Sequence, residues 1–139
     1  MRSGVGLTAA GVSCADCRID ASMVNFHGGE AMLELRVSNT DRYALALRAD
    51  GVLEVRRYRA GVATVLASAL GGVPDLTNWA SFTFTVQGTS PVTLTGSVNG
   101  TVKVRAQDSS VSALTGAGAA GIAATASGIL FDNFTLTGL

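Results

Sequence analysis

The sequence predicts an all-β fold in which two antiparallel sheets stack face to face as a sandwich. Val, Thr, Leu, Ala and Gly are abundant, and β-branched residues favour pleated surface while Gly supplies turns. Apolar and polar residues also alternate at a period of two, which is typical of strands with one buried face. The 139 residues fit a single domain spanning 1–139.

Alternation marks strands along 32–37, 43–48, 53–56 and 81–86, each bounded by Gly, Asn or Asp. The Gly- and Ala-rich segment 116–128 predicts a loop with a short strand at 121–124. A closing strand is expected over 129–136. No helical periodicity is apparent.

Two hairpins can be placed in register by matching apolar faces. A three-residue loop, Ala49-Asp50-Gly51 with Gly51 in the left-handed region, sets Leu47 opposite Leu53. The same loop type at 98–100 predicts two pairs: Leu94 with Val104, and Val92 with Ala106.

These registers place one set of side chains on the outward face of three neighbouring strands. The set is Met32, Glu34 and Arg36, then Ala44, Ala46 and Arg48, then Glu54, Arg56 and Tyr58. One interpretation is a solvated face with weak cross-strand ion pairs. The other is a recognition face, where Arg side chains donate hydrogen bonds and Tyr58 is an exposed stacking ring.

Other aromatic residues are expected in the core. Trp79 precedes an alternating strand and is predicted to plug the interior, and Tyr43 leads a buried strand face.

Cys14 and Cys17 are the only cysteines, in the order Cys-Ala-Asp-Cys. A zinc site would need two more ligands, and His27 supplies at most one. A redox motif would need a strand-to-helix context. Two readings stay open: a local disulfide or a pair of reduced thiols.

The charges of ten basic and ten acidic residues cancel. The chain therefore lacks the excess of basic residues that is typical of nucleic-acid-binding proteins, and no nucleic-acid partner is expected. No apolar run approaches the roughly eighteen residues of a membrane span, so no membrane partner is expected. Glu30, Glu34 and Glu54 form no alternating acidic pair of the kind glycoside cleavage needs, and His27 lacks a nucleophile elbow. The protein is predicted not to be an enzyme.

Several motifs resemble bacterial concanavalin A-like lectin/glucanase (laminin-G-like) domains. The segments LRVSNTDRYALAL and GVLEVRR resemble the family's paired hairpin strands, and WASFTFTVQG resembles its "WxxxxxxVxG" strand. The ending GAAGIAATASGILFDNFTL is similar to the family's closing "GxxGxxxxxxxxxFDNxxV". The resemblance runs from Cys17 onward and implies a jelly-roll β-sandwich without a catalytic residue.

The resemblance also exposes a departure at the start of the chain. Such domains usually open with an Asp-x-Phe strand that pairs with the closing strand, here Phe131 to Leu136. Either Val5 to Val12 substitutes for it, or the edge stays open and supports a homo-oligomer.

No cofactor is expected except the structural calcium that related domains hold near the sandwich rim. Its candidate ligands are Asp132 with Asp16 or Asp108. The alternative for Asp132 is a turn residue that satisfies its own backbone.

The resemblance implies a non-catalytic recognition module for a glycan or another surface polymer. Its ligand-binding candidates are Tyr58, Arg56, Arg48, Arg36, Glu54 and Glu34. The rival interpretation is a structural, self-assembling subunit or decoration protein of a virion, filament or surface layer, and a third is an inactive part of a larger secreted enzyme. An extracellular, virion-surface or cell-surface location is expected.

Overall fold

The computed structural model describes residues 7–8, 13–25, 29–70, 79–125 and 129–139. Eleven strands are found there: β1 (Leu7–Thr8), β2 (Cys17–Asn25), β3 (Ala31–Ser38), β4 (Asp41–Leu47), β5 (Val52–Arg59), β6 (Val62–Leu70), β7 (Ala80–Gln87), β8 (Val92–Val98), β9 (Thr101–Asp108), β10 (Ala119–Ala124) and β11 (Ile129–Gly138). The strands predicted at 121–124 and 129–136 are confirmed as parts of β10 and β11. The described residues contain no helix long and apolar enough to cross a membrane.

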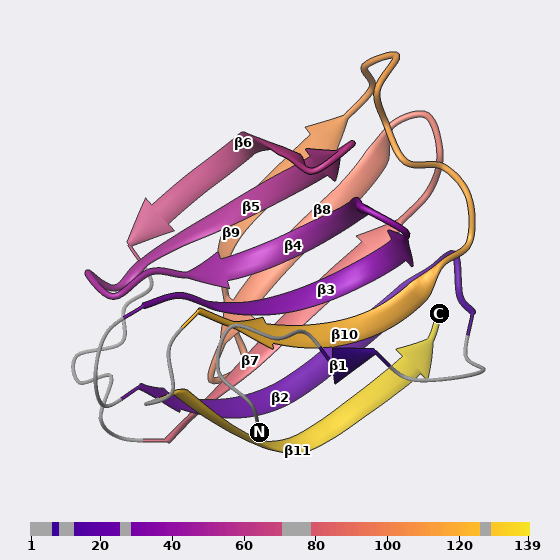
Figure 1. The fold of residues 1–139 in the computed structure, drawn as a ribbon. Helices are drawn as coiled ribbons and strands as arrows, with labels where there is room; N and C mark the ends of the chain where they lie inside the picture. Colours follow the sequence, from indigo (N-terminus) through magenta and orange to yellow (C-terminus); the bar gives the residue numbers. More distant parts are fainter. Residues whose placement is uncertain (1–6, 9–12, 26–28, 71–78, 126–128) are drawn as a thin grey trace.

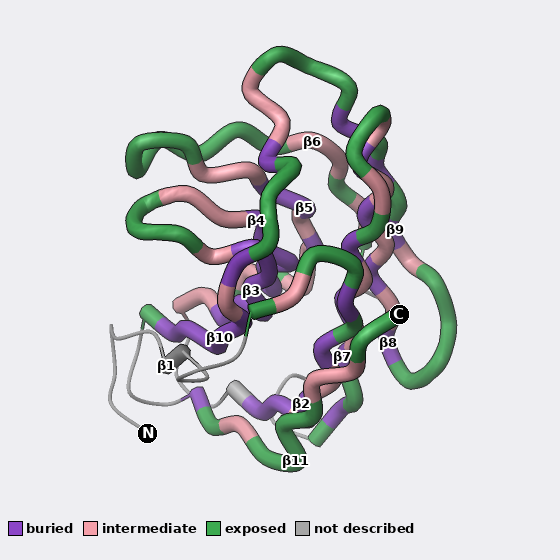
Figure 2. The backbone as a smooth tube through the Cα atoms, turned by 90° about the vertical axis from the view of Figure 1, so that its right-hand side faces the viewer, coloured by how far each residue is buried: buried purple, intermediate pink, exposed green. Residues whose placement is uncertain are grey.

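The strands form two antiparallel sheets packed face to face, which confirms the predicted sandwich (Figure 1). The six-stranded sheet has the order β1-β10-β3-β4-β5-β6, and the five-stranded sheet has the order β11-β2-β7-β8-β9. Figure 2 shows the two layers edge-on, with buried residues along the strands of both layers and exposed residues in most turns.

The core lies between the sheets, where the inward residues of the alternating strands meet. Leu33, Leu45 and Val55 of one sheet and Ile19, Phe84 and Leu94 of the other are almost fully buried. Gly96 lets the layers approach closely, because a Cβ there would lie 2.6 Å from Cδ1 of Leu45 in the facing sheet. Burying these apolar faces is the main term that favours this arrangement.

The first hairpin is as predicted. Leu47 lies opposite Leu53 and Leu45 opposite Val55, and Gly51 has a φ of 86°. The Gly51 amide donates to the Arg48 carbonyl, which closes the three-residue loop.

The prediction for the second hairpin is wrong. Asn99 and Gly100 both have positive φ and form a two-residue turn, with Val98 opposite Thr101. A bulge between Gly96 and Ser97 then restores the match of apolar faces. The observed pairs are Leu94 with Ala106 and Val92 with Asp108.

The closing strand β11 pairs along its length with β2, and no described strand pairs with its other edge. The described part of the segment Val5 to Val12, Leu7–Thr8, pairs with β10 instead. The opening segment therefore does not substitute for the family's Asp-x-Phe strand in the described residues.

The two aromatic predictions have opposite outcomes. Tyr43 is fully buried, as predicted. Trp79 is 52% exposed, so its prediction as a core plug is wrong. Alternation along β7 begins with buried Ala80, and this leaves Trp79 one residue outside the regular strand.

Candidate functional site

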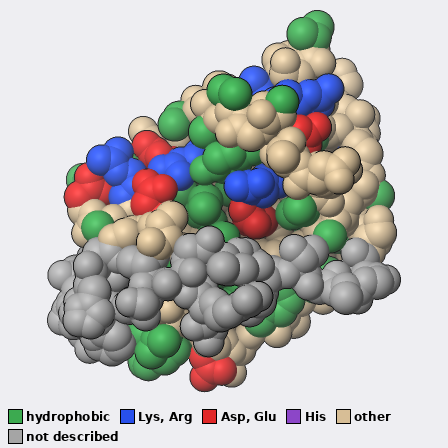
Figure 3. Space-filling view, viewed as in Figure 1, with side chains coloured by type: hydrophobic (Ala, Val, Ile, Leu, Met, Phe, Trp, Pro, Cys, Tyr) green, Lys and Arg blue, Asp and Glu red, His purple; other side chains and the backbone are tan. Residues whose placement is uncertain are grey.

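The outward face of the six-stranded sheet carries a floor of small residues bordered by charged side chains. Ala44 on β4 lies between Glu34 on β3 and Arg56 on β5. One row further, Ala46 lies between Met32 and Glu54. Figure 3 shows this face, with acidic and basic side chains gathered near the β4–β5 loop and separated by an apolar strip from a second acidic and basic pair.

Arg56 is the centre of the larger charged cluster. Its two terminal nitrogens donate to Glu30 as a parallel pair, at 2.9 and 2.7 Å. Its Nε donates to Glu54 Oε1 at 2.8 Å, and Nη1 also donates to the Tyr58 hydroxyl at 3.2 Å. Bidentate contacts of this kind fix both partners in one plane.

Arg48 extends the cluster toward the β4–β5 loop. It donates to Glu54 at 3.4 Å and to Asp50 at 2.8 Å. A cavity of about 300 Å³ opens beside this cluster, lined by Gly29, Glu30, Arg48, Ala49 and Asp50. The exposed carboxylate and guanidinium groups there can accept and donate hydrogen bonds side by side.

The contacts of Arg56 also fix the ionisation of its neighbours. Its hydrogen bond to Glu30 raises the pKa of Arg56 and lowers the pKa of the Glu30 carboxyl. Both groups therefore stay charged across the neutral range, and the cluster presents fixed donors and acceptors.

A second pair, Glu34 and Arg42, lies at the other side of the alanine floor. The two side chains form an ion pair, yet neither Glu34 Oε2 nor Arg42 Nε has an aligned hydrogen-bond partner among the described residues. Burial raises the pKa of Glu34, against the opposing pull of Arg42. The pKa of Glu34 is therefore shifted toward the neutral form, whereas that of Glu30 is shifted toward the charged form.

Tyr58 is not the free stacking ring that the sequence suggests. The guanidinium carbon of Arg42 lies 4.3 Å from the ring centroid, a cation–π contact that occupies one face of the ring. Tyr58 also packs against the cluster of Met32, Ala44 and Ala46 and is half-buried. Its hydroxyl and its ring edge are the parts left to contact a ligand.

The interpretation of a merely solvated face with weak ion pairs does not fit the burial. Arg56 is 8% exposed and Glu34 5%, and Ala44 and Ala46 are fully buried. Arg56, Arg48, Glu54, Glu34 and Tyr58 all lie on this face, but Glu34 belongs to the second pair and not to the cluster around Arg56.

Two members of the site, Glu30 and Arg42, were missed. Extending the same alternation by two residues would have found them. Glu30 lies an even number of positions from Glu34, and Arg42 an even number from Ala44, so each is expected on the same face as its neighbour.

The structure does not bring Arg36 to this face, which corrects its prediction. A bulge between Leu35 and Ser38 ends the regular alternation, and Arg36 has a φ of 53°. Its guanidinium donates to the carbonyls of Ala15, Leu114 and Gly88 and to the Asp16 carboxylate. Arg36 therefore holds the rim of the sandwich together.

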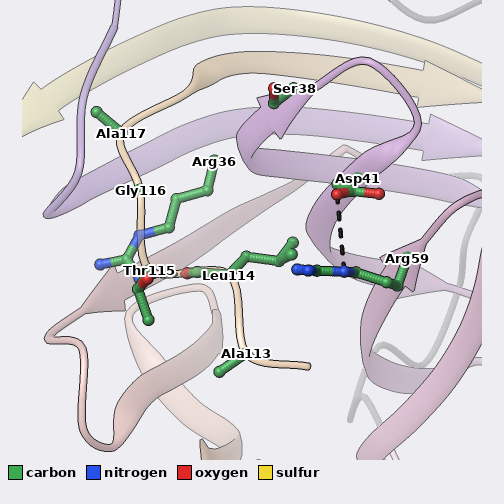
Figure 4. Close-up of a pocket in the computed structure, with 9 residues that line it drawn as sticks. All are labelled: Arg36, Ser38, Asp41, Arg59, Ala113, Leu114, Thr115, Gly116 and Ala117. Atoms are coloured by element: carbon green, nitrogen blue, oxygen red, sulfur yellow. Dashed lines mark hydrogen bonds and ion pairs between the residues drawn. The ribbon is translucent and has the colours of Figure 1, made fainter. Parts of the chain in front are cut away.

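A rim cavity of about 310 Å³ lies beside this cross-link (Figure 4). Arg59 extends into it from the end of β5 and pairs with Asp41 at 3.9 Å. The buried Arg36 side chain and the loop residues Leu114 to Gly116 form the other side.

The three candidate calcium ligands do not meet. Asp108 is buried and accepts from Tyr43, Arg57 and Ser110, while Asp16 accepts from Arg36 and the Gly88 amide. Asp132 is exposed on β11 and accepts from the Asn133 amide, as in the alternative reading. Among the described residues, no three Asp, Glu, His or Cys side chains come together as metal ligands.

Cys14 and Cys17 are joined as a disulfide, so the oxidised reading is the one that the structure contains. His27 lies outside the described residues.

A buried polar cluster behind the site was also missed. The Tyr43 hydroxyl donates to Asp108 at 2.8 Å and accepts from the Leu114 amide at 2.9 Å. Burial works to raise the pKa of Asp108, but hydrogen bonds from Arg57, Ser110 and Tyr43 together lower it. Burial raises the pKa of Tyr43 to about 12.

This shift predicts a loss of stability in strong alkali. Because the folded pKa of Tyr43 exceeds the unfolded value near 10, its contribution is complete below about pH 10 and is lost as the pH rises toward 12. In Tyr58→Phe, which retains Tyr43 as its one tyrosine, absorbance at 295 nm should rise with a midpoint near pH 12. A midpoint near 10 in the folded protein would contradict the buried hydrogen-bonded placement.

Neither a protein-family model nor a curated protein sequence matches this chain. Solved structures do match, and several of them are galectins. The galectin LEC-6 of Caenorhabditis elegans superposes with a TM-score of 0.67 at 12% identity, covering 99% of this chain and 92% of its own. CG-16, a homodimeric agglutinin from chicken liver, gives 0.68 at 6% identity over 96% and 100% of the two chains.

A tetrameric galectin from the ball sponge Cinachyrella gives a TM-score of 0.64 at 15% identity, over 94% and 96% of the two chains. These similarities show the fold, a concanavalin A-like jelly-roll β-sandwich, as the resemblance implied. They give no support to the rival prediction of a virion, filament or surface-layer subunit.

Proposed function

We propose that this protein is a non-catalytic module that binds a glycan or a related surface polymer on the outward face of its six-stranded sheet. The observation that supports this most directly is the hydrogen-bonded cluster of Arg56, Glu54, Glu30 and Arg48 beside the alanine floor. A sugar presents several hydroxyl groups, each a donor and an acceptor, and alternating guanidinium and carboxylate groups match that pattern. The similar galectins and agglutinin support the choice of ligand class.

The carboxylates of this face support the proposal that the module is not an enzyme. Glycoside cleavage needs one carboxyl with a raised pKa as acid and a second as base or nucleophile. The pKa of Glu30 is lowered by Arg56, and Glu54 is bound to both Arg56 and Arg48. Glu34 has a raised pKa but is buried against Arg42. These carboxylates are therefore occupied as partners of arginines.

The Cys14–Cys17 disulfide supports an oxidising location. Together with the ligand class, it favours a place outside the cell or on a cell or virion surface.

Substitutions at Arg48 and Arg56 test the proposal on an array of glycans of all major classes. Arg48→Ala removes the more exposed arginine and should weaken binding about tenfold or more, because a hydrogen bond to a charged group contributes about 1.5–3 kcal/mol. Arg56→Lys keeps the charge but cannot hold Glu30 and Glu54 in one plane, and a similar loss is expected.

The matched control is Arg105→Ala, which removes an exposed arginine from β9 in the other sheet. It should leave binding unchanged. If the wild type binds no glycan class, or if Arg48→Ala binds as well as Arg105→Ala does, the proposal fails.

A further inference from the structure

Each sheet of the sandwich ends in two edge strands, and the four edges differ in how they are protected. Edge strands expose unpaired backbone groups, and proteins usually guard them with charges, proline, short length or bulges. β1 is two residues long, and β9 carries Lys103 and Arg105. β11 carries Asp132 and a bulge between Asp132 and Thr135.

β6 differs from the other edges, because its sequence VATVLASAL contains no charge and no proline over nine residues, and its one guarding feature is a bulge at Leu66. It pairs with β5 on one side, and no described strand covers its other side. Leu66 packs partly against the core, but three other large apolar side chains of β6 are exposed: Leu70 is 79% exposed, Val62 67% and Val65 51%. Val62 and Leu70 occupy the two ends of the strand.

We propose that β6 is a self-association edge that pairs antiparallel with β6 of a second copy of this chain. A strand without charge meets its own copy without electrostatic repulsion, and an antiparallel pair about a two-fold axis is the usual closed arrangement. The unpaired backbone donors and acceptors of the edge are satisfied by this partner. The pairing joins two six-stranded sheets into one continuous sheet.

The bulge in β6 shapes this pairing. The register against β5 shifts so that Val65 and Ala67 have partners and Leu66 has none. A bulge disturbs pairing mainly at its own position. With Leu66 at the two-fold axis, the half 62–65 of one copy lies beside the half 67–70 of the other.

This arrangement brings Val62 of one copy near Leu70 of the other. Within one copy the two residues are eight positions apart, about 26 Å along a strand, and do not interact. A charge placed at either position therefore acts on the partner copy, and opposite charges at both positions attract only between copies.

Light scattering coupled to size-exclusion chromatography tests the proposal on the full chain. The wild type is expected to show twice the 14.1 kDa of one chain. Val62→Lys and Leu70→Glu should each shift the mass to one chain. The double variant Val62→Lys/Leu70→Glu should restore the dimer, because each lysine then meets one glutamate of the partner copy and the interface gains two such pairs.

Circular dichroism confirms that each variant is folded, and Phe134→Lys on the β11 edge, where Phe134 is 39% exposed, is the matched control. A monomeric wild type at high concentration overturns the proposal. So does a dimer that survives both single charges, a folded double variant that stays monomeric, or a dimer that Phe134→Lys dissociates.

Discussion

Replacing Arg36 with methionine is expected to lower the free energy of unfolding by about 3–5 kcal/mol, a range typical of removing one partner from a buried charged network. The side chain is almost fully buried and donates to three backbone carbonyls from separate parts of the chain: Ala15, Leu114 and Gly88. Methionine fills similar space but leaves these acceptors without their donor. Urea unfolding followed by circular dichroism measures the change.

Arg59→Met is the matched control at the same rim. Arg59 is half-exposed and its closest acidic atom is 3.9 Å away, so the change should stay within about 0.5 kcal/mol. Equal effects of the two substitutions would contradict the role of Arg36 as the rim cross-link.

Gly118→Ala is expected to lower the free energy of unfolding by about 3 kcal/mol or more, the upper end of the range of about 1–3 kcal/mol that is usual for overpacking. A Cβ at this position would lie 2.5 Å from the Arg36 carbonyl carbon and 2.7 Å from the Val37 nitrogen. These are backbone atoms inside a sheet, so they cannot rotate away as a side chain can. Gly118 also exchanges two backbone hydrogen bonds with Cys14, which a shift would lengthen.

Gly116→Ala supplies the comparison two residues earlier. A Cβ there meets no atom within 4 Å, and the residue is exposed. Its unfolding midpoint in urea should match the wild type. Similar losses in both variants would show that loop flexibility, rather than close packing of Gly118 on β3, sets the effect.

Period-two alternation predicted the fold and most of the candidate site because each strand residue repeats the environment of the residue two positions away. It identified the inward Leu45 and Val55 and the outward Glu34, Glu54 and Arg56. Two of the errors, the placement of Arg36 and the register of the second hairpin, share one cause. A bulge follows Leu35, and another lies beside Gly96, and each shifts the parity on which the prediction depended.

Two other features of the site depend on which residues lie opposite each other in the sheet, and not on the alternation alone. Glu30 joins Arg56 across 26 positions of the sequence, and this pairing follows from the sheet order. The Tyr58 ring was expected to be exposed, because its place in the alternation puts the side chain on the outward face. Arg42 covers one ring face, since β4 and β5 set the two residues directly opposite each other.

The most direct test of glycan binding on this face is a nuclear magnetic resonance titration of the ¹⁵N-labelled protein. The probe is the oligosaccharide that gives the strongest signal on the glycan array. We expect the largest shifts at the Nε–H groups of Arg48 and Arg56 and at backbone amides of β3, β4 and β5. Shifts confined to β2, β7 and β8 of the other sheet would show that the sugar binds elsewhere and would contradict the account.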